Sequence, residues 1–154
     1  MVSEIIIKYG KFLSLGSAVY IESNDIPETG SLIDSSISKL RAYSISVYGP
    51  PIIWTGMKLE KGKIKLDRKL IMQCRGDFSK IPIGFERKES VKIGPCVHAQ
   101  FAGKEENILR AYEKVSVYAY ENEIELKKEN YTVYVKQDGS DSTIDVFVPM
   151  EGDG

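Results

Sequence analysis

The order of the expected secondary-structure elements constrains this chain most, because the same order occurs twice along it. In each half, a strand-like segment is followed by an amphipathic helix and then by two further strand-like segments. The strand-like segments are residues 18–22, 52–54 and 63–72 in the first half and 96–101, 131–136 and 143–148 in the second. Two βαββ units in one chain predict an α+β fold, with two main helices packed on one face of a mostly antiparallel sheet.

The spacing of apolar residues places one helix in each half. The first is expected at about 31–48, where residues 49–51 (Gly-Pro-Pro) would end it. The second is expected at about 105–120. The apolar stripes are Ile33, Ile37, Leu40 and Val47 in the first helix and Ile108, Tyr112, Val115 and Ala119 in the second. Both helices contain the tetrapeptide Leu-Arg-Ala-Tyr, at 40–43 and 109–112, which supports an internal repeat.

The length of the chain fits one domain that contains both repeats. We expect a single domain over residues 1–154, with pseudo-repeats at about 1–80 and 81–150. Further strands are expected at 4–13 and 83–92, outside the two repeated units.

Composition excludes several classes of protein. Hydrophobic residues make up 42% of the 154 residues, which is enough to build a core without disulfides or metals. The 21 basic and 22 acidic residues leave a net charge of −1, whereas nucleic-acid-binding domains carry a clustered basic excess. No run of about 18 apolar residues occurs that would span a membrane. We therefore expect a soluble, cytoplasmic domain that contacts neither nucleic acid nor membrane directly.

The C-terminal half carries several short motifs in a defined order. These are a glycine turn at Gly103, a helix with Ala111-Tyr112, Val115 and Tyr118, a strand Tyr131-Thr132-Val133-Tyr134 and a closing strand Ile144-Asp145-Val146-Phe147-Val148-Pro149. In this order and spacing, residues 97–150 resemble the GyrI-like small-molecule-binding family. That family includes the effector-binding domains of multidrug-responsive and AraC-type transcription regulators, together with stand-alone relatives.

The resemblance implies a duplicated βαββ fold with a ligand cleft between the repeats, and Thr132 and Tyr134 would face that cleft. It implies a free-standing module that binds lipophilic, aromatic small molecules for sensing or sequestration. Where relatives carry a glutamate that pairs with cationic drugs or serves in hydrolysis, this chain has Thr132. A hydroxyl group can neither balance a buried positive charge nor act as a general base near neutral pH. We therefore expect non-catalytic binding and no cofactor.

Aromatic residues supply the remaining candidates for a ligand site. Trp54 lies on the strand of the first repeat that corresponds to 131–136, and aromatic walls suit flat ligands. Glu22 shares a strand face with Tyr20 and could replace the missing glutamate. Tyr112 and Tyr118 are about 120° apart around their helix, so if both contact one groove, each can lie only at its border. The candidate ligand-binding residues are thus Tyr20, Glu22, Trp54, Tyr112, Tyr118, Thr132 and Tyr134. Packing of the aromatic side chains in a filled core is the alternative.

The residue types that support other chemistry are few. Cys96 and His98 are two residues apart on one strand face, about 6.5–7 Å, which is too far for a direct thiolate–imidazole hydrogen bond. With Cys74 they are the only soft metal ligands, so no metal site is expected. Two other functions stay open: hydrolysis of reactive drug-like compounds, and inhibition of a DNA-handling enzyme such as gyrase. The open protein partners are such an enzyme, a regulator or a second copy of the chain.

Overall fold

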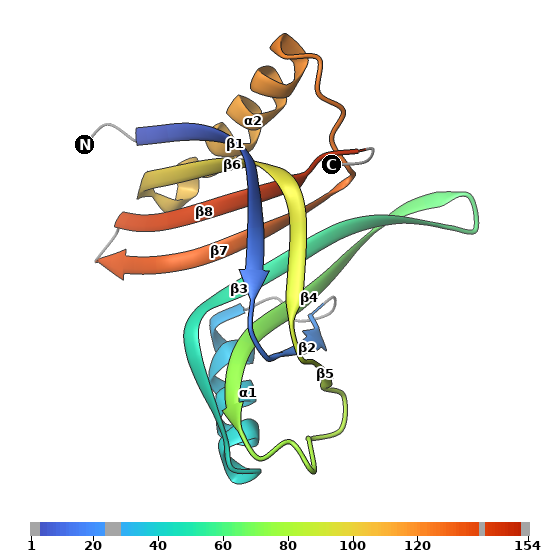
Figure 1. Ribbon diagram of the computed structural model, residues 1–154, viewed down its shortest axis with the longest axis vertical. Coiled ribbons are helices and arrows are strands. Elements are labelled where there is room, and N and C mark those ends of the chain that lie inside the picture. Colours follow the sequence, from blue (N-terminus) through green and yellow to red (C-terminus); the bar gives the residue numbers. More distant parts are fainter. Residues whose placement is uncertain (1–3, 24–28, 139–140, 152–154) are drawn as a thin grey trace. The chain divides into compact units, whose positions relative to one another are not determined.

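The computed structural model describes residues 4–23, 29–138 and 141–151 (Figure 1). In chain order, its elements are β1 (Glu4–Leu15), β2 (Ala18–Glu22), α1 (Thr29–Ala42), β3 (Ile45–Glu60), β4 (Lys63–Gly76), β5 (Glu86–Lys88), β6 (Val91–Lys104), the short 3-10 helix η1 (Glu105–Asn107), α2 (Leu109–Glu121), β7 (Glu129–Asp138) and β8 (Asp141–Pro149). The expected α+β class with a mostly antiparallel sheet is confirmed. None of the helices in these ranges is long and apolar enough to cross a membrane.

The chain divides into two compact units, each containing one repeat. The N-terminal unit is Ser14–Val91, and the C-terminal unit is Lys92–Gly154 together with Met1–Leu13. In both units the third strand of the repeat lies between the other two, giving the strand orders β2-β4-β3 and β6-β8-β7. All four of these pairings are antiparallel. The two repeats therefore have the same topology, with β5 added beside β2 and β1 added beside β6.

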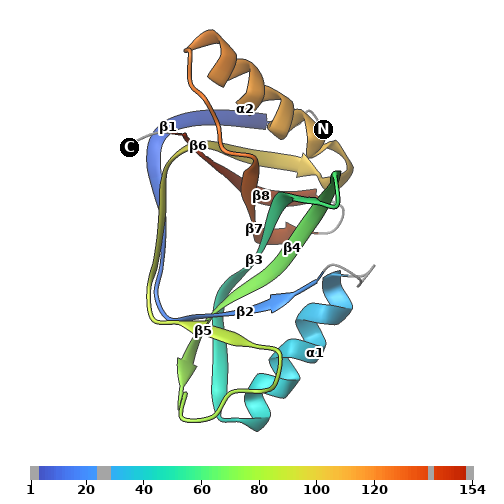
Figure 2. The same ribbon diagram turned by 90° about the vertical axis from the view of Figure 1, so that its right-hand side faces the viewer.

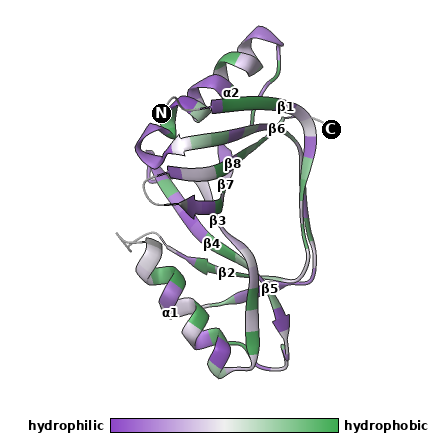
Figure 3. Cartoon of the chain, turned by 90° about the vertical axis from the view of Figure 1, so that its left-hand side faces the viewer, coloured by the Kyte–Doolittle hydropathy of each residue, from purple (hydrophilic) through white to green (hydrophobic). Residues whose placement is uncertain are grey.

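The core of the C-terminal unit lies between α2 and the sheet. Strands β6 and β8 contribute alternate residues, and α2 contributes small or β-branched ones that let the helix approach closely. The buried cluster consists of Val97, Ala99, Phe101, Ala111, Val115, Ile144, Val146 and Val148. In the hydropathy colouring of Figure 3, hydrophobic and hydrophilic residues are interspersed along α2, and the first part of β1 is hydrophobic. The expected position of the second helix and the burial of Val115 and Ala119 on it are confirmed.

Helix α1 packs against β3 and is shorter than the sequence predicts (Figure 2). It ends at Ala42, and Ser44 adopts a left-handed conformation with φ 63°, which stops the helix. The expected end near residue 48 is therefore wrong, and Val47 lies in β3. Residues 49–51 instead cause a register shift between β3 and β4 from Tyr48 to Ile52, because proline has no N–H for the ladder.

A two-residue turn joins β3 and β4 and was missing from the sequence prediction. Glu60 pairs with Lys63, and Lys61 and Gly62 between them have φ values of 51° and 76°. Positive φ at both positions is typical of the tight turns that match the twist of antiparallel strands. Strands expected at 52–54 and 63–72 are thus parts of one long hairpin.

The two cysteines give a first test of this packing. Cys74 and Cys96 are free and fully buried, and burial raises the pKa of each thiol to about 11. At pH 8 a thiol with that pKa is ionised in about one molecule in a thousand, against roughly one in four for an ordinary cysteine.

We therefore expect neither thiol to react with Ellman's reagent at pH 8 in the folded protein. Both should react rapidly in guanidinium chloride. Rapid reaction of one thiol under native conditions would show that its strand is open to solvent.

Candidate functional site

Strand register brings three of the predicted ligand residues to one face of the N-terminal unit. Tyr20 on β2 pairs with Ile71 on β4, and Glu22 pairs with Lys69. Trp54 on β3 also pairs with Lys69, so Glu22 and Trp54 lie on either side of it in one row across three strands. Directly paired residues in an antiparallel sheet point to the same face. Tyr20, Glu22 and Trp54 therefore share a face.

A hollow of about 430 Å³ opens beside Tyr20 and Glu22. It is lined by Tyr20, Ile21, Glu22, Lys69, Gly84 and Glu86, and we call it the Tyr20 hollow. Glu86 reaches it because β5 pairs with the free edge of β2, where Glu86 lies opposite Tyr20. The hollow thus combines one aromatic ring, two carboxylates and one ammonium group.

The charges around Tyr20 act on its ring and on its hydroxyl group. The Nζ atom of Lys88 lies 4.6 Å from the centre of the Tyr20 ring, a cation–π contact. Burial raises the pKa of Tyr20, and the negative charge of Glu86 raises it further. The phenol group of Tyr20 therefore keeps its proton to a higher pH than that of an ordinary tyrosine.

Trp54 lies next to the hollow but does not line it. Its indole ring folds along β3 over Gly56, where an added Cβ atom would come within 2.5 Å of a ring carbon. The Nζ atom of Lys69 lies 5.7 Å from the centre of the same ring. Lys69 therefore connects the Trp54 ring to the Tyr20 hollow.

In the C-terminal unit, Thr132 and Tyr134 lie on the face of the sheet that α2 covers. Thr132 is buried, and its Oγ1 atom is 2.5 Å from the hydroxyl oxygen of Tyr112 on α2. Tyr134 is partly buried and packs against the buried cluster. The Thr132 hydroxyl is thus engaged by a neighbouring side chain of the same unit.

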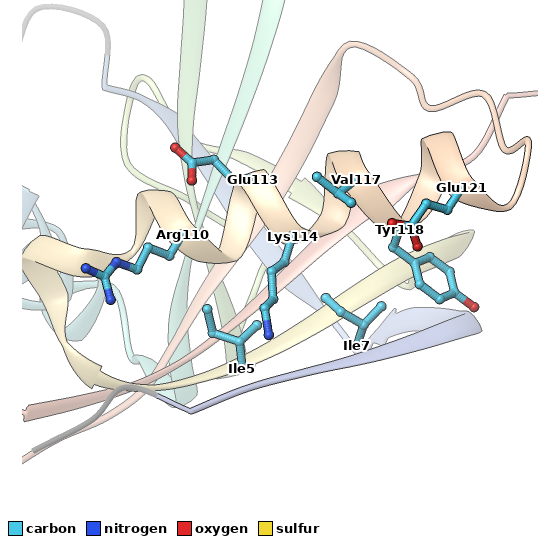
Figure 4. A pocket seen from close by; sticks show the side chains of 8 residues that line it. All are labelled: Ile5, Ile7, Arg110, Glu113, Lys114, Val117, Tyr118 and Glu121. Atoms are coloured by element: carbon cyan, nitrogen blue, oxygen red, sulfur yellow. The ribbon is translucent and has the colours of Figure 1, made fainter.

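Tyr118 lies about a third of a turn around α2 from Tyr112, and both pack against the buried cluster. It lines a groove of about 560 Å³ between α2 and β1, where Ile5 and Ile7 point toward the helix (Figure 4). Tyr112 instead bonds to Thr132 on β7. The angular separation predicted for the two tyrosines therefore places them against different strands.

Sequence reasoning missed Lys69, Lys88 and Glu86. These residues come near Tyr20 and Trp54 only through the pairing of β2 with β4 and β5, which no local pattern reveals. The alternation of Tyr20 and Glu22 was the one local signal that pointed to this face. A role in ligand binding for the seven candidate residues, and the cleft between the repeats, stay predictions.

Cys96 and His98 make separate contacts. The Cys96 thiol donates to the carbonyl oxygen of Ile93 at 3.6 Å. His98 stacks on Phe147 with ring centres 4.1 Å apart, and its Nε2 atom lies 3.5 Å from Oδ1 of Asp145. The structure pairs each residue with a different neighbour, so the two form no nucleophilic dyad.

Comparison with known proteins shows similarity of fold. No protein-family model and no curated protein matches the chain. The C-terminal domain of EcmrR is similar with a TM-score of 0.64 and 14% identity, over 98% of this chain and 99% of that one. EcmrR in its DNA complex is similar with a TM-score of 0.63 and 17% identity over 97% of this chain, which spans only 57% of that chain. A hydrolase encoded by lin2189 from Listeria innocua is similar with a TM-score of 0.54 and 10% identity, over 97% of this chain and 91% of that one. These likenesses are consistent with a GyrI-like fold.

The raised pKa of Tyr20 predicts a pH-dependent contribution to stability. The folded state holds the phenol proton more tightly than the unfolded chain, so this contribution is complete below about pH 10 and is lost as pH rises through the folded pKa. Between pH 8 and about pH 11, the free energy of unfolding in urea should fall less for Tyr20→Phe than for the unchanged protein. The loss of stability for Glu86→Gln should lie between those of the other two proteins, because this variant removes one of the two causes of the raised Tyr20 pKa.

Tyr9→Phe serves as the matched control for this series, because Tyr9 is exposed. Its free energy of unfolding should change with pH in the same way as that of the unchanged protein, from pH 8 to about pH 11. Identical pH dependence of Tyr20→Phe and Tyr9→Phe would contradict the placement of Tyr20.

The bond between Tyr112 and Thr132 predicts energetic coupling. Tyr112→Phe and Thr132→Val should each lower the free energy of unfolding by about 1–2 kcal/mol, because each leaves its partner short of a hydrogen bond. The double variant should lose about 1 kcal/mol less than the sum of the two. Thr143→Val, at an exposed position of β8, should show no coupling with Tyr112→Phe. Additive losses for Tyr112 and Thr132 would contradict the bond.

Proposed function

We propose that this chain binds a lipophilic, aromatic small molecule without converting it, and that the ligand is a cation whose charge is held in the Tyr20 hollow. The observation that supports this most is the composition of the hollow. Glu22 and Glu86 supply two carboxylates around the Tyr20 ring, whereas Lys69 supplies one ammonium group among the lining residues. With Lys88 over the Tyr20 ring, the two carboxylates are balanced by two ammonium groups. A cationic ligand that displaces one of the lysines would keep this balance, whereas a neutral ligand would leave a carboxylate uncompensated.

The contacts of the lysines suggest how a ligand cation would be recognised. Lys88 lies over the Tyr20 ring at 4.6 Å, and Lys69 lies 5.7 Å from the Trp54 ring. Both rings thus have a positive group near them, which their π-systems attract. A flat cation would compete with these flexible lysines and add stacking area that an ammonium group lacks. The lysine side chains are long enough to move aside into solvent.

Thr132 takes a different role in this proposal from that of the glutamate in the family it resembles. Its hydroxyl is bonded to Tyr112, so this position supplies no charge. Glu22 would carry the anionic role instead, from the other repeat. Tyr112, Tyr118 and Tyr134, which were also predicted as ligand contacts, lie in the C-terminal unit, and their role in binding stays a prediction.

The fold likenesses give the proposal its biological setting. One similar structure is the C-terminal domain of EcmrR, a protein that has also been solved in complex with DNA. This chain spans 57% of the EcmrR chain in that complex, so it corresponds to the domain and not to the whole protein. We infer a sensing or sequestering module of the same fold, whose ligand is read out by another segment or partner.

The proposal is tested by titrating Trp54 fluorescence with two matched planar dyes, N-methylacridinium and neutral acridine, at pH 8. Trp54 is the single tryptophan, so quenching reports one location. We expect N-methylacridinium to bind at least tenfold more tightly than acridine. Glu22→Gln and Glu86→Gln should each weaken binding of the cation about tenfold, or ~1.4 kcal/mol, and change acridine binding less than about twofold.

Glu106→Gln is the matched control, because Glu106 is an exposed carboxylate of the C-terminal unit. It should leave both affinities unchanged. Equal affinity for the two dyes, or cation binding that survives both substitutions at the hollow, would contradict the anionic site. Absence of saturable quenching in folded protein would contradict the whole proposal.

A further inference from the structure

Strand β1 leaves one edge of the C-terminal sheet open. It lies beside β6 at the end of the strand order, and within the described ranges no strand pairs with its other edge. The sequence at this edge is Glu4-Ile5-Ile6-Ile7-Lys8, and Ile6 is 52% exposed. An open edge with three successive isoleucines is a template for pairing with another strand.

The helix beside this edge continues the apolar surface. In the groove between β1 and α2, Ile5 and Ile7 lie below Lys114 and Tyr118, and Val117 also contributes to the lining (Figure 4). Val117 is 54% exposed, and Tyr120 on the next turn is 86% exposed. Arg110, Glu113, Lys114 and Glu121 complete the lining with charges of both signs. The edge and the helix together form one surface that combines exposed apolar side chains with charges of both signs.

The β1 edge is complementary to itself. If two copies pair antiparallel across a two-fold axis normal to the sheet, each residue keeps its face, so even-numbered residues meet even-numbered ones. With Ile6 opposite Ile6 of the second copy, Ile5 meets Ile7, and Glu4 meets Lys8 in both directions. Shifting the centre to Ile5 or Ile7 removes both Glu4–Lys8 pairs. The Ile6-centred register therefore pairs opposite charges and also pairs isoleucine with isoleucine.

We propose that two copies of this chain associate through the Glu4–Lys8 edge of β1, with the adjacent faces of α2 covering the joined strands. In the Ile6-centred register, Ile5 and Ile7 of both copies meet on the face of the sheet that α2 covers, next to the groove. The same two-fold axis sets the two α2 helices antiparallel, so Arg110 near the start of one approaches Glu121 at the end of the other. Opposite charges then meet on the helices as well as on the strands.

The size of this surface sets the strength of association. A stable interface takes roughly 20–30 residues from each partner, more than one strand edge and one helix face supply. We therefore expect a reversible dimer with a dissociation constant in the micromolar range and not an obligate one.

The test is sedimentation velocity of the full chain from about 5 to 500 μM at low salt, where charge pairs are least screened. The unchanged protein should shift from monomer to dimer over this range. Glu4→Lys and Lys8→Glu should each weaken dimerisation at least tenfold, because each replaces two attractive pairs with two repulsive ones. The double variant Glu4→Lys/Lys8→Glu restores opposite charges and should return the dissociation constant to within about threefold of the original.

Lys80→Glu is the control for net charge, because Lys80 is an exposed residue of the N-terminal unit. It should dimerise like the unchanged protein, and circular dichroism should show that every variant is folded. A monomer at all concentrations would overturn the proposal. Dimerisation that ignores the single charge reversals, or that the double variant fails to restore, would overturn it as well.

Discussion

The antiparallel pairing of the third strand of each repeat with the two strands beside it determines the rest of this structure. In the N-terminal unit, β4 is paired along both edges, and its consecutive residues Leu70, Ile71 and Met72 are all buried. In the C-terminal unit, β8 has the same place between β6 and β7. Because side chains alternate between faces, a shift of one residue in either central strand would move every neighbour to the wrong face. The helices and the Tyr20 hollow therefore depend on this register.

The repeated order of elements could be predicted because it rests on local patterns. Alternation gave β2 as residues 18–22, and apolar spacing located α2 to within a few residues. The end of α1 was wrong because prolines were interpreted as a helix stop. In the structure they lie in a β-strand with a register shift, whereas the stop is the left-handed Ser44. Serine carries no strong signal for that conformation, which glycine or asparagine adopts more often.

The candidate site could be predicted only in part, for a related reason. Tyr20 and Glu22 follow from strand alternation, so their shared face was visible in the sequence. Glu86 is opposite Tyr20 because a strand of three residues, β5, pairs with the edge of β2. So short a strand has too few residues to show a period. The bond between Tyr112 and Thr132 joins a helix to a strand across the core, and neither local pattern contains that information.

The two ends of the strand order show how charge is used at sheet edges. At β5 the edge carries Glu86 and Lys88 on the face of Tyr20, so short length and charge limit further pairing there. At β1, Glu4 and Lys8 lie four residues apart on either side of three isoleucines. These charges disfavour pairing with strands that do not place a basic residue opposite Glu4 and an acidic residue opposite Lys8. A second copy of the same segment has that pattern by symmetry. The proposed dimer surface and the Tyr20 hollow share no residue, since they belong to different units. Charge reversal at Glu4 or Lys8 therefore leaves the residues of the hollow unchanged, and dimerisation and ligand binding can be tested separately.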